Sequence, residues 1–132
     1  MKINKLQIFL VFFIVMLSAC KEETTSDGDT IVCTASIDPA IRIQVLDKET
    51  GFAISCGAKA VISEGDFSEE VENPAGENCN DSQMLIGADE RSGTYDLMVS
   101  KEGYLDWYAT NIQVSANLCH VNTVTVQAYM EK

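Results

Sequence analysis

The sequence has 132 residues, of which 46% are hydrophobic and 22% are charged, with a formal net charge of −11 at pH 7. This length is typical of one domain with a short extension. Nucleic acids and anionic lipid headgroups are recognised by basic patches, so the acidic balance argues against both as partners.

Residues 1–19 have the pattern of a cleaved export signal. Lys2 and Lys5 give a positive start, and residues 6–17 are almost entirely apolar. This apolar stretch is too short for a hydrocarbon core of about 30 Å, which needs about 20 residues. It suits the hydrophobic region of a signal peptide.

The sequence Leu17-Ser18-Ala19-Cys20 resembles the lipobox of bacterial lipoproteins. The resemblance implies that Cys20 is acylated with palmitate-like chains, becomes the new amino terminus and anchors the protein in a membrane. Two or more acyl chains hold stably where one does not, because each buried CH₂ contributes about 0.8 kcal/mol. The alternatives are an ordinary secretory signal with a chance cysteine, or a short membrane anchor.

Cleavage would remove two lysines and no acidic residue, changing the net charge from −11 to −13. The following Lys21-Glu22-Glu23 resembles the export tag of Bacteroidetes lipoproteins, which implies display on the outer face of the bacterial outer membrane. The alternative is a charged start to a linker. Residues 20–32 are polar enough to predict a lipidated, flexible tether.

The remaining cysteines are even in number: Cys33, Cys56, Cys79 and Cys119. In a small exported domain this predicts two disulfides, for which three pairings are possible. A zinc site is the alternative, although no CxxC pair is present. We favour Cys33–Cys119, which would tie the start of the domain to its last strand, with Cys56–Cys79 closing an irregular loop.

Residues 33–132 are predicted to form one all-β domain. Period-two alternation or short apolar runs separated by turn residues predict strands at 41–45, 52–54, 58–62, 67–71, 84–86, 95–99, 105–114 and 124–130. The alternation changes register at Thr110-Asn111, which predicts a β-bulge. No stretch after Cys20 sustains a helical period. About seven short strands of this kind are typical of a β-sandwich.

Several motifs resemble carboxypeptidase regulatory-like domains. They are the IQVLDKETG stretch at 43–51, RSGTYDL at 91–97, KEGY at 101–104 and CHV at 119–121. The resemblance covers residues 41–130 and implies a transthyretin-like (prealbumin-like) Greek-key sandwich of seven strands. It implies no catalytic residues, since such domains serve as accessory, adhesive or folding modules. Cys56 and Cys79 are departures from the general pattern, as is the absence of a proline after Gly51.

His120 is the only histidine. A histidine beside a cysteine can act as the base for nucleophilic catalysis. Oxidation of Cys119 into a disulfide would remove that nucleophile, so we expect His120 to hydrogen-bond a neighbouring loop instead.

Acidic side chains cluster between residues 64 and 72, and two more lie at 89 and 90. Paired carboxylates can cleave glycosidic bonds and converging ones can bind Ca²⁺, but an acidic surface also keeps edge strands from pairing. We favour the surface interpretation and expect no bound metal or cofactor. The residues are Glu64, Asp66, Glu69, Glu70, Glu72, Asp89 and Glu90. The Asp27-Gly28-Asp29 stretch lacks the ligand spacing of an EF-hand.

Tyr104, Trp107 and Tyr108 form an aromatic group. Alternation places Trp107 in the core with Leu105 and Ala109. Tyr104 and Tyr108 are therefore the candidate ligand-binding residues, able to stack on a sugar or anchor a peptide. The alternative is that they cap the core with the hydroxyl in water.

These patterns predict a lipid-anchored, monomeric module that binds a protein or a glycan and is not an enzyme. A structural envelope lipoprotein without a specific ligand is the alternative, and an enzyme using paired carboxylates is the least favoured. An exposed aromatic hollow would favour binding, whereas a deep pocket holding carboxylates with raised pKa values would favour catalysis.

Overall fold

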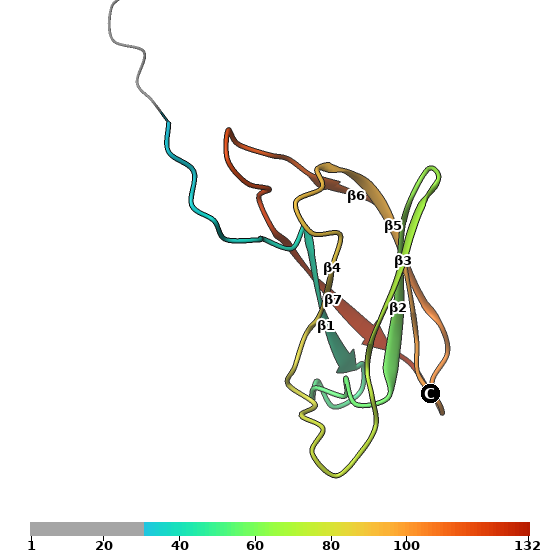
Figure 1. Ribbon diagram of the computed structural model, residues 1–132. Coiled ribbons are helices and arrows are strands. Elements are labelled where there is room, and N and C mark those ends of the chain that lie inside the picture. The colour runs from blue at the N-terminus through green and yellow to red at the C-terminus, as the bar shows by residue number, and fades with distance from the viewer. Residues whose placement is uncertain (1–30) are drawn as a thin grey trace, which may run out of the picture. The chain divides into compact units, whose positions relative to one another are not determined.

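The computed structural model describes residues 31–132 (Figure 1). The predicted signal peptide, Cys20 and the Asp27–Asp29 stretch lie outside the described residues. Within 31–132 no helix is long and apolar enough to cross a membrane.

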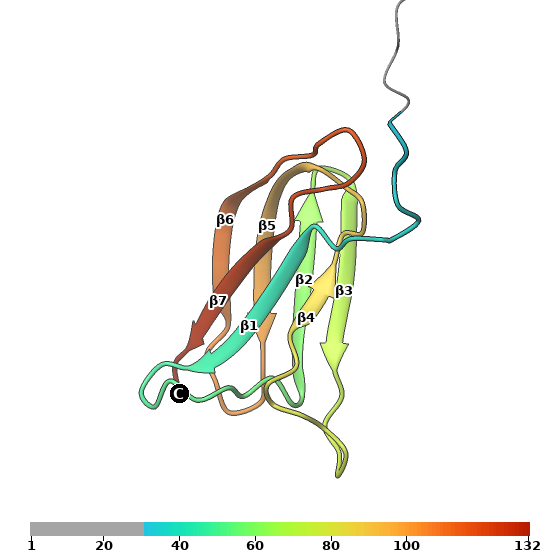
Figure 2. The same cartoon turned by 90° about the vertical axis from the view of Figure 1, so that its left-hand side faces the viewer.

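Seven strands form two sheets that pack face to face, as Figure 2 shows. The strands are β1 (Ile41–Asp47), β2 (Ala58–Glu64), β3 (Phe67–Asn73), β4 (Leu85–Gly87), β5 (Gly93–Ser100), β6 (Trp107–Val114) and β7 (Val124–Met130). One sheet has the order β4-β1-β7 and the other β3-β2-β5-β6. The predicted all-β, seven-stranded sandwich is confirmed.

The first and last strands lie side by side. β1 pairs with β7 in parallel along its whole length, from Ile41 opposite Val124 to Asp47 opposite Met130, and pairs with the short β4 in antiparallel fashion. The sandwich therefore has a proximal end, where residues 33–40 lead into β1, and a distal end, where β1 and β7 finish (Figure 2).

The core lies between the two sheets and follows from period-two alternation. Ile41, Ile43 and Val45 of β1 face Tyr95, Leu97 and other buried residues of the opposite sheet. Each such aliphatic side chain contributes about 1.5–3 kcal/mol by leaving water. Tyr95 is fully buried, and its hydroxyl donates to the Arg91 carbonyl at 2.8 Å, so its polar end is satisfied.

The predicted bulge in β6 is confirmed. Between the Tyr95–Ile112 and Leu97–Ala109 pairs, two residues of β6 face one residue of β5. Asn111 takes a φ of 60°, which asparagine tolerates better than most residues, and its amide donates to Asp96 Oδ1 at 3.1 Å. The bulge returns Ile112 to the inner face, where it packs against the core.

Both predicted disulfides are present. Cys33–Cys119 joins the segment before β1 to the β6–β7 loop, with the Cα atoms 5.3 Å apart. Cys56–Cys79 joins the β1–β2 connection to the β3–β4 loop, with the Cα atoms 5.8 Å apart. One bridge therefore fastens each end of the sandwich.

Three details of the sequence prediction were wrong. Residues 52–54 make only the Leu46–Ala53 bridge and form no strand, and β3 continues to Asn73. Leu105 was expected in the core but lies before β6 and is 62% exposed. Its amide donates to the Glu131 carbonyl at 2.7 Å, which holds the β5–β6 turn against the end of the chain and directs the side chain outward.

We predict that replacing both Cys56 and Cys79 with alanine lowers the free energy of unfolding by about 3 kcal/mol, because a loop of this size regains its entropy in the unfolded chain. Equilibrium urea denaturation would measure the change. A loss well below 1 kcal/mol would show that the β3–β4 loop is held by its hydrogen bonds rather than by the bridge.

Candidate functional site

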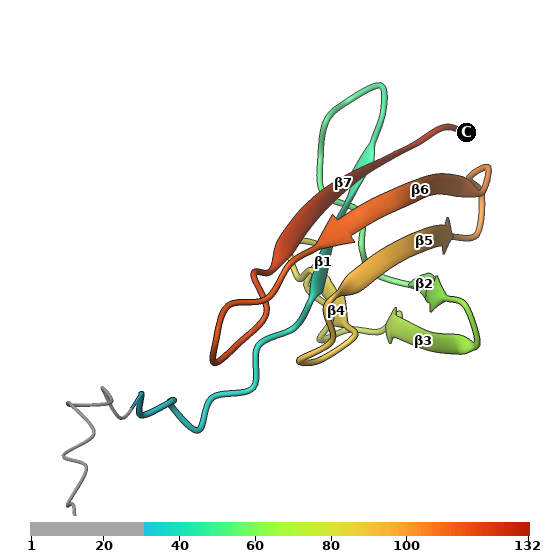
Figure 3. The ribbon, with the colours of Figure 1, turned by 90° about the horizontal axis from the view of Figure 1, so that it is seen from above.

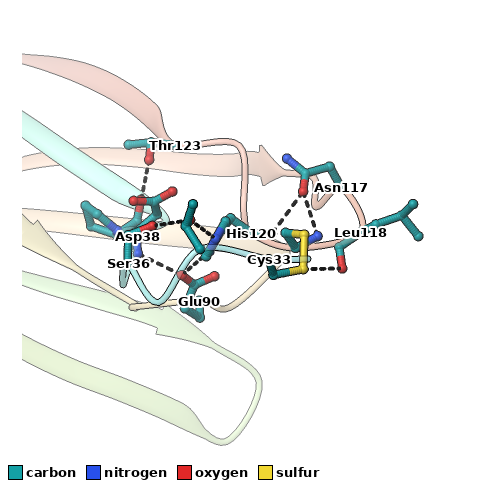
Figure 4. Close-up of polar contacts among 11 residues, drawn as sticks. Cys33, Ser36, Asp38, Glu90, Asn117, Leu118, His120 and Thr123 are labelled. Atoms are coloured by element: carbon teal, nitrogen blue, oxygen red, sulfur yellow. Dashed lines mark hydrogen bonds and ion pairs between the residues drawn. A yellow bond between two sulfur atoms is a disulfide. The ribbon is translucent and has the colours of Figure 1, made fainter. Parts of the chain in front are cut away.

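Three separate segments meet at the proximal end of the sandwich (Figure 4). Asp38 precedes β1, Glu90 lies in the β4–β5 loop and His120 lies in the β6–β7 loop. One carboxylate oxygen from each acid and one ring nitrogen of His120 all lie within 4.8 Å of one another. We call these three residues the proximal cluster.

Both ring nitrogens of His120 have partners. Nδ1 lies 2.8 Å from Glu90 Oε1, and Nε2 lies 2.9 Å from the Thr34 hydroxyl. The prediction that His120 bonds a neighbouring loop is confirmed. The hydrogen bond to Glu90 raises the pKa of His120 and outweighs the opposing effect of partial burial.

Glu90 is fixed mainly by backbone groups. Its Oε1 accepts from the Asp38 amide at 2.8 Å, while its own amide donates to the Asp38 carbonyl at 2.9 Å. The Asp38 amide is the main cause of the lowered pKa of Glu90, followed by the bond to His120. Glu90 also takes a φ of 52°, a left-handed backbone that is uncommon for this residue type.

The loop that carries His120 is preorganised by its own sequence. Asn117 Oδ1 accepts from the amides of Cys119 and His120, at 2.8 and 2.9 Å. The Cys33–Cys119 bridge then holds this turn beside the segment that carries Thr34. The position of the imidazole ring is therefore set by a turn and a covalent link.

Thr34, His120 and Glu90 follow the hydroxyl–imidazole–carboxylate order of an activated nucleophile. Acyl transfer also needs amide donors directed at a developing oxyanion. The two backbone amides nearest the imidazole in the chain, those of Cys119 and His120, already donate to Asn117 Oδ1. We therefore interpret the series as orienting the ring rather than activating Thr34.

A hollow of about 320 Å³ lies at the distal end, where β6 begins and β7 finishes. Figure 3 shows these two strands side by side, at the edge where the two sheets meet. The hollow is lined by Leu105, Trp107, Tyr129, Lys48, Asp106 and Glu131. Its volume is at the lower limit of ligand pockets, which are about 300–1,000 Å³.

The lining of this distal hollow combines apolar and charged side chains. Leu105 and Tyr129 are both exposed, whereas Trp107 is partly buried against the core. Lys48 and Glu131, which also line the hollow, form an ion pair. The hollow therefore presents aromatic and aliphatic surface together with charged groups.

Asp47 is the most confined carboxylate near this end, with 4% of its surface exposed. Its Oδ1 accepts from the Thr50 amide at 2.9 Å, and its Oδ2 accepts from the Tyr104 hydroxyl at 2.8 Å and faces Lys132 Nζ at 3.3 Å. These bonds, with the Thr50 amide contributing most and Tyr104 next, hold the pKa of Asp47 far below its ordinary value.

The two predicted ligand-binding tyrosines do not form one surface. Tyr104 packs against the core and gives its hydroxyl to Asp47. Tyr108 is 63% exposed on the outer face of the four-stranded sheet, opposite Met98. The structure instead places Trp107 and Tyr129 in the lining of one hollow, although 22 positions separate them in the chain and no local pattern links them.

Several carboxylates of the predicted acidic surface make bonds within the fold. Glu64 accepts from the Thr94 amide and Glu69 from the Ala88 amide, each at 2.7 Å. Glu70 and Glu72 lie 3.7 and 3.2 Å from Lys59 Nζ. These carboxylates satisfy backbone amides or pair with a lysine, while Asp66 and Asp89 are exposed.

Comparison of the chain with protein-family models and with curated protein sequences found no match.

We predict that Asp47→Asn destabilises the domain at neutral pH, because the asparagine NH₂ cannot accept from the Tyr104 hydroxyl. The Asp47 carboxylate resists protonation in the folded state, so its contribution is present above about pH 4 and is lost as the pH falls further. The wild type should therefore take up close to one more proton on unfolding at low pH than the variant.

Urea denaturation at a series of pH values between about 2 and 7 would measure this. Glu49→Gln is the matched control, since Glu49 is exposed and also carries one charge in the same turn. Equal pH dependence in the wild type and Asp47→Asn would contradict the assignment.

Proposed function

We propose that this protein is a lipid-anchored extracytoplasmic binding module whose ligand occupies the distal hollow. The observation that carries the proposal is the position of the hollow: it lies at the opposite end of the sandwich from residues 33–40 (Figure 2). An anchor at Cys20 would be attached through residues 20–32, which reach at most about 45 Å when fully extended. The distal hollow would then be presented away from the membrane.

The two disulfides support the extracytoplasmic part of the proposal. Such bridges form and persist in oxidising compartments and are rare in a reducing cytosol. One of them, Cys33–Cys119, lies immediately after the proposed tether. A disulfide at this position fits a domain that is located in an oxidising compartment outside the cytoplasm.

The chemistry of the distal hollow favours a glycan ligand. Trp107 and Tyr129 offer aromatic surface to the C–H face of a sugar ring, and both are amphipathic side chains that tolerate a partly wet site. Asp106 and Glu131 can accept hydrogen bonds from sugar hydroxyls, and Lys48 can donate them. The net negative charge of the chain favours neutral or amino sugars over polyanionic glycans.

Trp107 is the only tryptophan, so its fluorescence reports directly on the hollow. We predict a saturable fluorescence change when the purified protein is titrated with neutral or amino-sugar oligosaccharides, and none with polygalacturonate. Tyr129→Ala should weaken binding by up to about tenfold, because an aromatic contact contributes up to about 1.5 kcal/mol.

Tyr108→Ala is the matched control, because it removes an exposed tyrosine from the outer face of the other sheet. Its affinity should equal that of the wild type. A response to peptides and none to glycans would overturn the glycan assignment in favour of a protein ligand. No response to either would favour a structural envelope lipoprotein.

For the anchor, we predict that mass spectrometry of the membrane-extracted protein finds an amino-terminal peptide that begins at acylated Cys20. Cys20→Ser should abolish incorporation of a palmitate label, whereas the neighbouring control Ser18→Ala should retain it. Addition of protease to intact cells would test surface display. An unmodified Cys20 in the native protein would refute the anchor.

A further inference from the structure

The proximal cluster is independent of the proposed ligand site and has its own chemistry. We propose that Asp38, Glu90 and His120 bind a divalent transition-metal ion, with Zn²⁺ as the probe. Imidazole nitrogen and carboxylate oxygen are both zinc ligands, and three protein ligands with a remaining position for water are a known arrangement. Imidazole favours zinc and its neighbours over Ca²⁺, which takes oxygen ligands.

The geometry of the cluster is close to that of a coordination sphere. Zinc–ligand distances of about 2.0–2.2 Å place neighbouring ligands of a tetrahedron about 3.4 Å apart. His120 Nδ1 and Glu90 Oε1 are 2.8 Å apart, and the Asp38 oxygen completes a set within 4.8 Å. Metal binding would require His120 Nδ1 and Glu90 Oε1 to separate by about 0.6 Å and the Asp38 carboxylate to approach them.

The ring of His120 is oriented as a metal ligand would be. A metal-binding histidine usually donates its other ring N–H to a fixed acceptor, which selects the tautomer. The Thr34 hydroxyl lies 2.9 Å from Nε2, on the side of the ring away from the acids. A metal at this position would replace the proton that Nδ1 now shares with Glu90, and the N–H on Nε2 would then donate to the Thr34 hydroxyl.

The charges in the cluster are unbalanced, which distinguishes it from an ordinary ion pair. Glu90 is paired with His120, but within residues 31–132 no hydrogen bond or ion pair engages the Asp38 carboxylate. Two carboxylates therefore share one imidazole at a site where the side chains of His120 and Glu90 are only 16% and 33% exposed. A divalent cation would neutralise both acids.

The Asp47 carboxylate at the distal end differs from that of Asp38 in having partners. Both oxygens of that carboxylate have donors, from backbone amides, a tyrosine and a lysine, so it has no unmatched charge. The proximal cluster is the place where an acid, oriented toward another acid and a histidine, has no partner among the described residues. A bound metal would link the segment before β1 and two loops that a disulfide already holds together.

The test is isothermal titration of Zn²⁺ into the mature, membrane-extracted protein with its disulfides intact. We expect one ion per chain and at least tenfold weaker binding in Asp38→Asn. This variant should keep its fold, because the Asp38 side chain makes no bond within residues 31–132. Circular dichroism and thermal unfolding of Asp38→Asn would verify that.

Asp89→Asn is the matched control, since Asp89 is exposed next to Glu90 and its removal changes the net charge equally. Its zinc affinity should stay within twofold of the wild type. If zinc affinity fell equally in Asp38→Asn and Asp89→Asn, the loss would reflect non-specific attraction to an acidic surface. That result would refute the proposed site.

The only histidine provides a second readout. Zinc should shift the Nδ1 resonance of His120 in nitrogen NMR spectra far more than the Nε2 resonance. Zinc binding with unchanged His120 resonances would place the ion elsewhere and refute the proposal. The absence of any zinc binding would refute it as well, and neither result would affect glycan binding at the distal hollow.

Discussion

The rest of the structure depends on the parallel pairing of β1 with β7. These strands are the first and last of the domain, and their register runs without a break from Ile41–Val124 to Asp47–Met130. Because parallel neighbours begin at the same end of a sheet, the segment before β1 and the loop before β7 are brought together. The proximal cluster and the Cys33–Cys119 bridge both occur there. The distal hollow occurs where the same strands, together with the start of β6, finish.

Acidic side chains have different roles at the two ends. At the distal end Asp47 is surrounded by donors and acts as part of the turn that follows β1. At the proximal end Glu90 accepts from the Asp38 amide and pairs with His120, and no residue of 31–132 pairs with the Asp38 carboxylate. Net charge alone does not reveal this division, because each ionised carboxylate contributes one negative charge whether or not it accepts from backbone amides.

Local patterns in the sequence predicted the fold well. Alternation located the strands that supply the core, the shift at Thr110-Asn111 located the bulge, and the even number of cysteines with their positions gave both disulfides. The candidate sites were not predictable in the same way. Asp38, Glu90 and His120 are 52 and 30 positions apart, and each sits in a loop with no period. Leu105 fits the alternation that predicts a core position, but its side chain is exposed. Its backbone amide donates to the Glu131 carbonyl, which fixes the β5–β6 turn in another orientation.

The Cys33–Cys119 bridge has a mechanical consequence. A pull on the chain ahead of Cys33 reaches the domain at two points, since the bridge passes part of the load directly to the loop that leads into β7. β1 and β7 would then be drawn in the same direction, and the hydrogen bonds between them would carry little relative force. β1 could not be peeled from the sheet alone while the bridge is intact. Force would instead act on the contacts between these two strands and the rest of the sandwich.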